Sequence, residues 1–142
     1  MIVLDSDHLA VLQTPGPVAQ ALAQRLRTAP DRSITTTIVN IEEGLRGWLA
    51  RIHQAPTPDQ EIRGYVNLAG FFALFAGWAL LPYDTAAQQR YQDLRAQRLR
   101  SIGPQDLKIA AIVLGQPNAL LLSANLRHFR LVPGLRVEDW IH

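Results

Sequence analysis

Four acidic residues lie where a carboxylate needs a compensating partner. Asp5 directly follows the apolar residues 1–4, Glu42 and Glu43 lie in the first turns of an apolar helix pattern, and Asp106 begins another. A carboxylate beside a buried segment is costly unless it is solvated, hydrogen-bonded or bound to a cation. Because Mg²⁺ and Mn²⁺ bind carboxylate oxygens, water and phosphate, three convergent acids would suffice for a metal-dependent site.

Each acid also has an ordinary explanation. Asp5 or Asp7 would cap the helix that follows, and Glu42, Glu43 and Asp106 would complement the positive N-terminal end of a helix. The position of any one acid leaves both explanations open. The functional explanation gains only if the fold brings the acids to one rim.

Alternating strands and helices must position these acids. Apolar or β-branched runs predict strands at 1–4, 33–37 and 119–123, and a weaker one at 80–83. Helical patterns, the first of them capped by Asp7, cover residues 7–12, 18–28, 38–52, 59–79, 85–100 and 105–114. This order predicts an α/β fold with a parallel sheet, in one domain over residues 1–142. Functional groups gather at the carboxyl ends of such strands, where Asp5 and Asn125 are expected.

Composition narrows the function classes. Cysteine is absent, which excludes disulfides, zinc-thiolate sites and thiol nucleophiles. The longest apolar run, residues 68–81, is shorter than the roughly 18 residues of a membrane span, so we expect no membrane association. It predicts either a core helix or a surface that packs on a second copy. Lys108 is the only lysine among 14 basic residues, and such an arginine bias suits nucleic-acid contact or reflects a GC-rich genome.

The motifs, taken in order, resemble the PIN-domain family, in particular the VapC-type toxins of bacterial toxin–antitoxin systems, over the whole chain. Residues 4–9, LDSDHL, resemble the family's opening LDTDHL segment. Residues 35–47 resemble its second motif, in which a Glu stands four residues before a Gly. That spacing selects Glu43, although Gly44 replaces the usual Leu and leaves Glu42 as an alternative.

Three later stretches carry the same resemblance. Residues 106–111, DLKIAA, are similar to the family's D-x-x-I-A-A helix, and residues 123–129, SANLRHF, to its T-R-N-x-x-D-F motif. Residues 133–140, PGLRVEDW, are similar to its P-G-L-x-V-x-x-W ending. His128 stands where the family usually has an acid, and Asn125 occupies a position that holds Asp in other branches, so a fourth carboxylate is missing.

The resemblance implies a metal-dependent endoribonuclease with a central parallel sheet of four to five strands flanked by helices. The implied metal is Mg²⁺ or Mn²⁺, and the implied partners are RNA, a VapB-type antitoxin and a second copy in a homodimer. The expected location is the cytoplasm. The expected catalytic residues are Asp5, Glu43, Asp106 and Asn125, of which the three acids hold the metal. The expected substrate-binding residues are Ser123, Arg127 and Lys108.

Two other functions remain open. The missing fourth acid permits a catalytically degenerate PIN-like module that binds RNA or a partner without cutting. Asp5 and Asp7 also form the D-x-D of a haloacid-dehalogenase-like phosphatase, with Asp5 as nucleophile. That family expects Thr or Val where Leu9 stands, and it assigns no role to Glu43.

Overall fold

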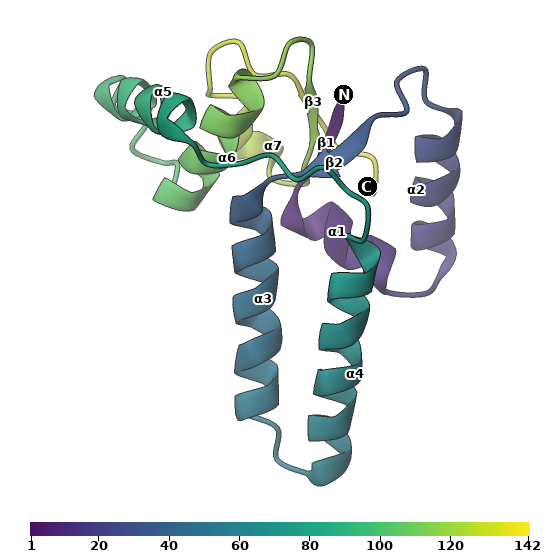
Figure 1. The fold of residues 1–142 in the computed structure, drawn as a ribbon. Helices are drawn as coiled ribbons and strands as arrows, with labels where there is room; N and C mark the ends of the chain where they lie inside the picture. Colours follow the sequence, from purple (N-terminus) through teal and green to yellow (C-terminus); the bar gives the residue numbers. More distant parts are fainter.

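The computed structural model describes residues 1–142 and places a four-stranded sheet between helices (Figure 1). The strands lie in the order β2-β1-β3-β4, and every pairing is parallel. Their bounds are β1 (Ile2–Leu4), β2 (Ile34–Thr36), β3 (Leu120–Leu122) and β4 (Val137–Glu138). The predicted α/β fold with a parallel sheet is therefore confirmed. The sheet has four strands, the lower of the four to five expected.

Seven helices complete the chain. They are α1 (Ser6–Gln13), α2 (Pro17–Thr28), α3 (Ile38–His53), α4 (Pro58–Leu74), α5 (Thr85–Ala96), α6 (Pro104–Leu114) and α7 (Leu126–Phe129). Because side chains alternate along a strand, the two faces of the sheet contribute to two separate cores. Val3 and Leu121 pack with residues of α5 and α6, while Leu4 and Leu122 pack with residues of α1, α2 and α4. None of the helices is both long enough and apolar enough to cross a membrane.

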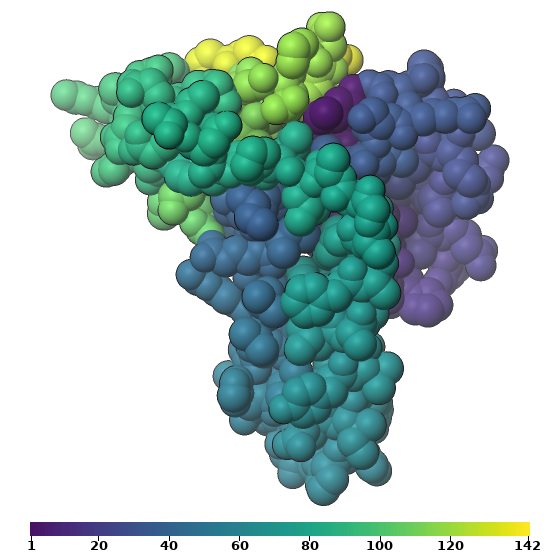
Figure 2. Space-filling view, viewed as in Figure 1, coloured from purple at the N-terminus to yellow at the C-terminus, as the bar shows by residue number.

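Helices α3 and α4 form a hairpin that projects from the sheet (Figures 1 and 2). Two glycines allow its helices to pack closely. A Cβ atom at Gly44 would lie 2.5 Å from the ring of Phe71, and one at Gly64 would lie 2.8 Å from the side chain of Ile52. The Gly44 that departs from the usual family residue thus makes room for an aromatic ring of α4.

Several predicted boundaries are wrong for local backbone reasons. Helix α4 ends at Leu74, because the chain turns through Gly77 at φ +81°. Helix α5 ends at Ala96, and Arg98 has a positive φ of 57°. Residues 80–83 form no strand but one isolated bridge, between Leu81 and Thr37. The short elements α7 and β4 carry too few residues to show a period and were not predicted.

The predicted cap of α1 is also wrong. Asp7 lies inside the first turn, and the N-cap residue is Asp5, whose side chain makes no capping hydrogen bond. The carboxylate of Asp5 is therefore engaged elsewhere. By contrast, helix α5 has a side-chain cap, since the Asp84 side chain accepts a hydrogen bond from the amide of Ala87.

Candidate active site

Asp5 stands at the carboxyl end of the central strand β1 and is 7% exposed. Its amide donates to the carbonyl of Leu122 on the neighbouring strand. Oδ2 accepts a 2.6 Å hydrogen bond from the Ser123 hydroxyl, and Oδ1 accepts a 2.7 Å hydrogen bond from the Asn40 amide. The carboxylate is therefore fixed from both sides, by the strand β3 end and by helix α3.

Burial raises the pKa of the Asp5 carboxyl from its ordinary value of 3.8 to about 6. The charge of nearby Asp7 raises this pKa further, whereas the hydrogen bonds from Ser123, Asn40 and the Ser6 amide lower it. Desolvation thus outweighs the donors around the carboxylate. A cation bound beside Asp5 would lower this pKa, because it would stabilise the charged carboxylate.

Asn40 is the residue that the sequence analysis missed. It is buried, and its amide group joins three polar side chains. Nδ2 donates to Asp5 Oδ1 and, at 3.0 Å, to the Ser6 hydroxyl, while Oδ1 accepts from the hydroxyl of Thr37. A signal was present, because Asn40 lies three residues before Glu43 and so shares its helix face.

Glu43 and Glu42 point to different surroundings. Oε2 of Glu43 accepts a 2.7 Å hydrogen bond from the Ser6 hydroxyl, which links it through Asn40 to Asp5. The exposed Glu42 instead forms a 3.0 Å ion pair with Arg46 and accepts from Gln105. The geometry therefore favours Glu43 over Glu42 as the inward acid.

Asp106, in the first turn of α6, closes the network from the other side. Its Oδ2 accepts a 2.9 Å hydrogen bond from the Asn125 side chain. Asn125 Nδ2 also lies 3.0 Å from His128 Nδ1, which is 3.6 Å from Asp106 Oδ2. The backbone amide of Asn125 donates to the Ser123 hydroxyl, which itself donates to Asp5. This half of the site is therefore connected to Asp5.

The predicted substrate-binding residues are dispersed. Ser123 is buried and donates its hydroxyl to Asp5, so it positions the acid and offers no surface to a substrate. Arg127 is exposed on α7. The ammonium group of Lys108 lies 5.7 Å from the ring centroid of Tyr83 and 5.8 Å from that of Tyr91. Only Ser123 of the three is therefore part of the carboxylate network.

The three acids do not form a ready-made metal cluster, as no three carboxylate or histidine side chains converge closely enough to hold an ion. The reason is that hydroxyl and amide donors of Ser6, Asn40, Ser123 and Asn125 stand between them. The donor set nevertheless fits a hard cation. Oε1 of Glu43 and Oδ1 of Asp106 take part in no hydrogen bond, and both are carboxylate oxygens of the kind that Mg²⁺ and Mn²⁺ bind.

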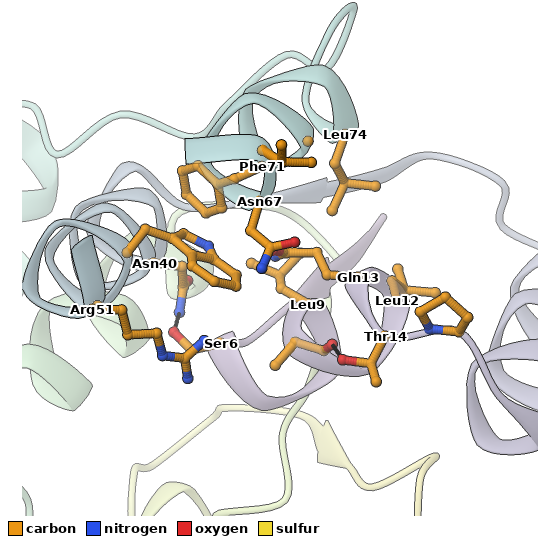
Figure 3. A pocket seen from close by; sticks show the side chains of 17 residues that line it. Ser6, Leu9, Leu12, Gln13, Thr14, Asn40, Arg51, Asn67, Phe71 and Leu74 are labelled. Atoms are coloured by element: carbon orange, nitrogen blue, oxygen red, sulfur yellow. Dashed lines mark hydrogen bonds between the residues drawn. The ribbon is translucent and has the colours of Figure 1, made fainter. Parts of the chain in front are cut away.

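A groove of about 800 Å³ opens beside this network, between α1, α3 and α4 (Figure 3). Ser6 and Asn40, which bond to the site acids, line it together with apolar groups such as Leu9 and Phe71. Arg51 lines the same groove and lies over the ring of Trp48. A ligand in this groove would therefore reach the edge of the carboxylate network.

Comparison with known proteins gives one curated relative and several structures. No family model matches the chain. The tRNA(fMet)-specific endonuclease VapC of Salmonella typhimurium (strain LT2) is 35% identical over 77 residues, which cover 52% of this chain and 58% of the relative. The aligned stretch thus spans little more than half of each protein.

Two crystal structures share the fold over nearly the whole chain. One is VapBC-1 from nontypeable Haemophilus influenzae, with a TM-score of 0.73 and 22% identity. The match covers 100% of this chain and 100% of the matched chain. The other is VapBC2 from Rickettsia felis bound to a DNA fragment from their promoter, with a TM-score of 0.71, 18% identity and coverage of 99% of both chains. The fold is that of these proteins, and part of the chain is similar in sequence to the Salmonella VapC.

Proposed function

We propose that this chain, similar in sequence and fold to VapC-type proteins, is a metal-dependent endoribonuclease and the toxin of a VapBC-type pair. One observation carries the proposal. The buried carboxylate of Asp5 is joined by hydrogen bonds to Asp106 on one side and to Glu43 on the other, at the carboxyl end of the central strand. The name of the similar Salmonella protein supports the same activity.

The acids Asp5, Glu43 and Asp106 would hold Mg²⁺ or Mn²⁺. A bound ion of this kind orients a water molecule and stabilises negative charge on a phosphodiester. The chain's own residues then have separate tasks. Ser123 and Asn40 fix the Asp5 oxygens, Asn125 fixes Asp106, and the partly buried acids exclude phosphate until a cation neutralises them. Exposed Arg127 would contact the RNA backbone.

The test is cleavage of single-stranded RNA by the purified protein with Mg²⁺ or Mn²⁺. An EDTA sample and an Asp106→Asn variant serve as controls. Cleavage by the wild type that EDTA and the substitution both abolish is the expected result. No cleavage by the wild type with either metal, or equal cleavage by the variant, would refute the proposed activity.

A second candidate has one observation in its favour. The position of the usual fourth acid holds His128, Asn125 is an amide, and no three acids converge as a cluster. A degenerate module that binds RNA without cutting it would have this arrangement. Such a module would retain RNA binding in Mg²⁺ without cleavage. The phosphatase alternative has less support, because it assigns no role to Glu43 and Asp106, which belong to the same hydrogen-bond network as Asp5.

The proposed antitoxin would lie in the groove between α1, α3 and α4. The groove offers the exposed Val66 and the half-buried Trp48 to an apolar face, and its polar edge at Ser6 suits a cationic side chain directed at the acids. Co-expression with the product of an adjacent small reading frame tests this assignment. We expect co-purification with the wild type and its loss on Val66→Asp, with Leu49→Asp, an exposed residue of α3 outside the groove, as the matched control.

The proposed homodimer would use the outer face of α4, because large apolar side chains are exposed there. Ile62 is 59% exposed, Tyr65 is 57% exposed and Phe72 is 55% exposed. Burying such a face against a second copy would be favourable. Light scattering at high concentration tests this proposal, with a dimer expected for the wild type and a monomer for Ile62→Glu. Only monomers for the wild type would remove the dimer.

A further inference from the structure

A second polar chain supports the site from behind and uses residues without an assigned role. His8 is completely buried in α1. Its Nδ1 atom lies 2.6 Å from Asp7 Oδ1, and its Nε2 atom lies 3.1 Å from the backbone nitrogen of Trp140. An amide N–H can only donate, so Nε2 must be the acceptor and Nδ1 must carry the proton. The C-terminal segment thereby selects the tautomer that donates to Asp7.

Asp7 passes this constraint to the loop after β3. Its other oxygen, Oδ2, accepts a 2.7 Å hydrogen bond from the amide of Ala124. Ala124 lies between Ser123, whose hydroxyl fixes Asp5, and Asn125, whose side chain fixes Asp106. The Ser123 amide in turn donates to the carbonyl of Glu138 on β4. The loop that orients both acids is therefore anchored by Asp7 and by the C-terminal strand.

We infer that His8 is a positioning residue, which acts through Asp7 and the Ala124 amide to set the Ser123 and Asn125 groups that orient Asp5 and Asp106. The inference rests on the proposed function for its effect on turnover, but the positioning itself can be measured without it. The outer partners of a functional site are worth roughly 10- to 100-fold when removed. His8 touches none of the three acids, so its contribution is to kcat through geometry and leaves KM unchanged.

Two substitutions separate the contacts of His8. In His8→Asn the side-chain amide takes the place of Nδ1 and can still donate to Asp7, but it cannot reach Trp140. In His8→Gln the amide takes the place of Nε2 and keeps the contact with Trp140 instead. We expect His8→Gln to lower kcat roughly 10- to 100-fold and His8→Asn to stay within about threefold of the wild type. Exposed His53, substituted by Gln, is the matched control.

Hydrogen exchange at the Ala124 amide gives the second measurement. We expect exchange roughly tenfold faster or more in His8→Gln than in His8→Asn, as for the loss of a hydrogen bond to a charged group. Equal kcat and equal exchange in the two variants would overturn the inference. If the wild type does not cleave RNA, the proposed activity fails, while the exchange rates still decide the role of His8.

The wild-type protein supplies a measurement that needs no variant. The imidazole ¹⁵N spectrum should show a proton on Nδ1 of His8 and none on Nε2. Asp139 Oδ1, 3.7 Å from Nε2, offers the competing arrangement of a charged His8 between two acids. A charged ring, or a proton on Nε2 alone, would overturn the inference even where a substituted chain fails to fold.

Discussion

The two halves of the candidate site solve the same electrostatic problem differently. The inner half, around Asp5, is buried, and hydroxyl and amide donors occupy both oxygens of its carboxylate. The outer half, around Asp106, is partly exposed, and one carboxylate oxygen has no hydrogen bond. Asn125 and His128 surround Asp106 where further acids would add negative charge.

The inner half therefore holds its carboxylate in a fixed position, whereas the outer half supplies an accessible negative charge. The inner half fixes one acid and raises its pKa, whereas the outer half leaves an acid accessible to solvent and ligand. A cation that enters from the outer side would stabilise the charged form of the Asp5 carboxyl. It would also contact the oxygens of Glu43 and Asp106 that make no hydrogen bond. Substitutions in the two halves should therefore have unequal consequences.

The largest effect is expected from removing the inner charge. Asp5→Asn should reduce RNA cleavage about 100-fold or more, since an amide holds a divalent cation far less well than a carboxylate. The free energy of unfolding of the metal-free protein at pH 7 should rise by at most about 3 kcal/mol, because the amide removes the desolvated charge and can still accept from Asn40. Initial rates and urea unfolding of both proteins at pH 7 measure these effects. Full activity of the variant would contradict the role of Asp5.

The same substitution should alter how stability depends on pH. The pKa of Asp5 is about 6 in the folded state against an ordinary 3.8, so within this window the folded state binds more protons. Stability of the metal-free protein should therefore fall as pH rises from 3.8 to about 6, by at most about 3 kcal/mol. Urea unfolding of wild type and Asp5→Asn between pH 4 and 7 should show this decline only in the wild type. Parallel curves would contradict the raised pKa.

The paired glutamates give the next effect. Glu43→Gln should lower cleavage roughly 10- to 100-fold, because it removes a charge linked through Ser6 to the inner half. Glu42→Gln removes the same charge from an exposed residue paired with Arg46 and should change cleavage less than about twofold. Steady-state rates on one RNA substrate compare them. A larger loss for Glu42→Gln would reverse the assignment.

The smallest effect concerns the outer half. Asn125→Asp would place a second carboxylate beside Asp106, where the two charges repel each other unless a cation lies between them. Saturating Mn²⁺ should therefore raise the Tm of the variant by about 3 °C more than that of the wild type, or roughly 1 kcal/mol. Thermal unfolding with Mn²⁺ and with EDTA measures the difference. An identical Mn²⁺ shift in both proteins would show that this position lies outside the ion's reach.

The strands and long helices were predictable because their patterns are strong. The buried run before Asp5 and the apolar helix after Asp106 follow from periodicity alone. The end of α4 was not predictable, because apolar residues continue past Leu74 and the turn at Gly77 is not visible in that pattern.

The site divides in the same way. Its three acids stand out beside apolar segments, but the side chains that connect them do not. Asn40 and Ser6 each lie in a helix, where a polar residue has ordinary explanations, and only the fold brings them to Asp5 and Glu43. The burial of Ser123 could not be predicted for the same reason, because burial just after β3 cannot be seen in the residue type.

The most direct test of one shared cation site is Mn²⁺ broadening in the ¹H–¹⁵N spectrum of the wild-type protein. Paramagnetic Mn²⁺ broadens resonances near the bound ion, so substoichiometric additions locate it without an assay of activity. The proposed site predicts that the amides of Asp5, Glu43, Asp106 and Asn125 broaden first and together, and that excess Mg²⁺ restores them. Broadening that begins at other acids, or that spares Asp5, would contradict the account.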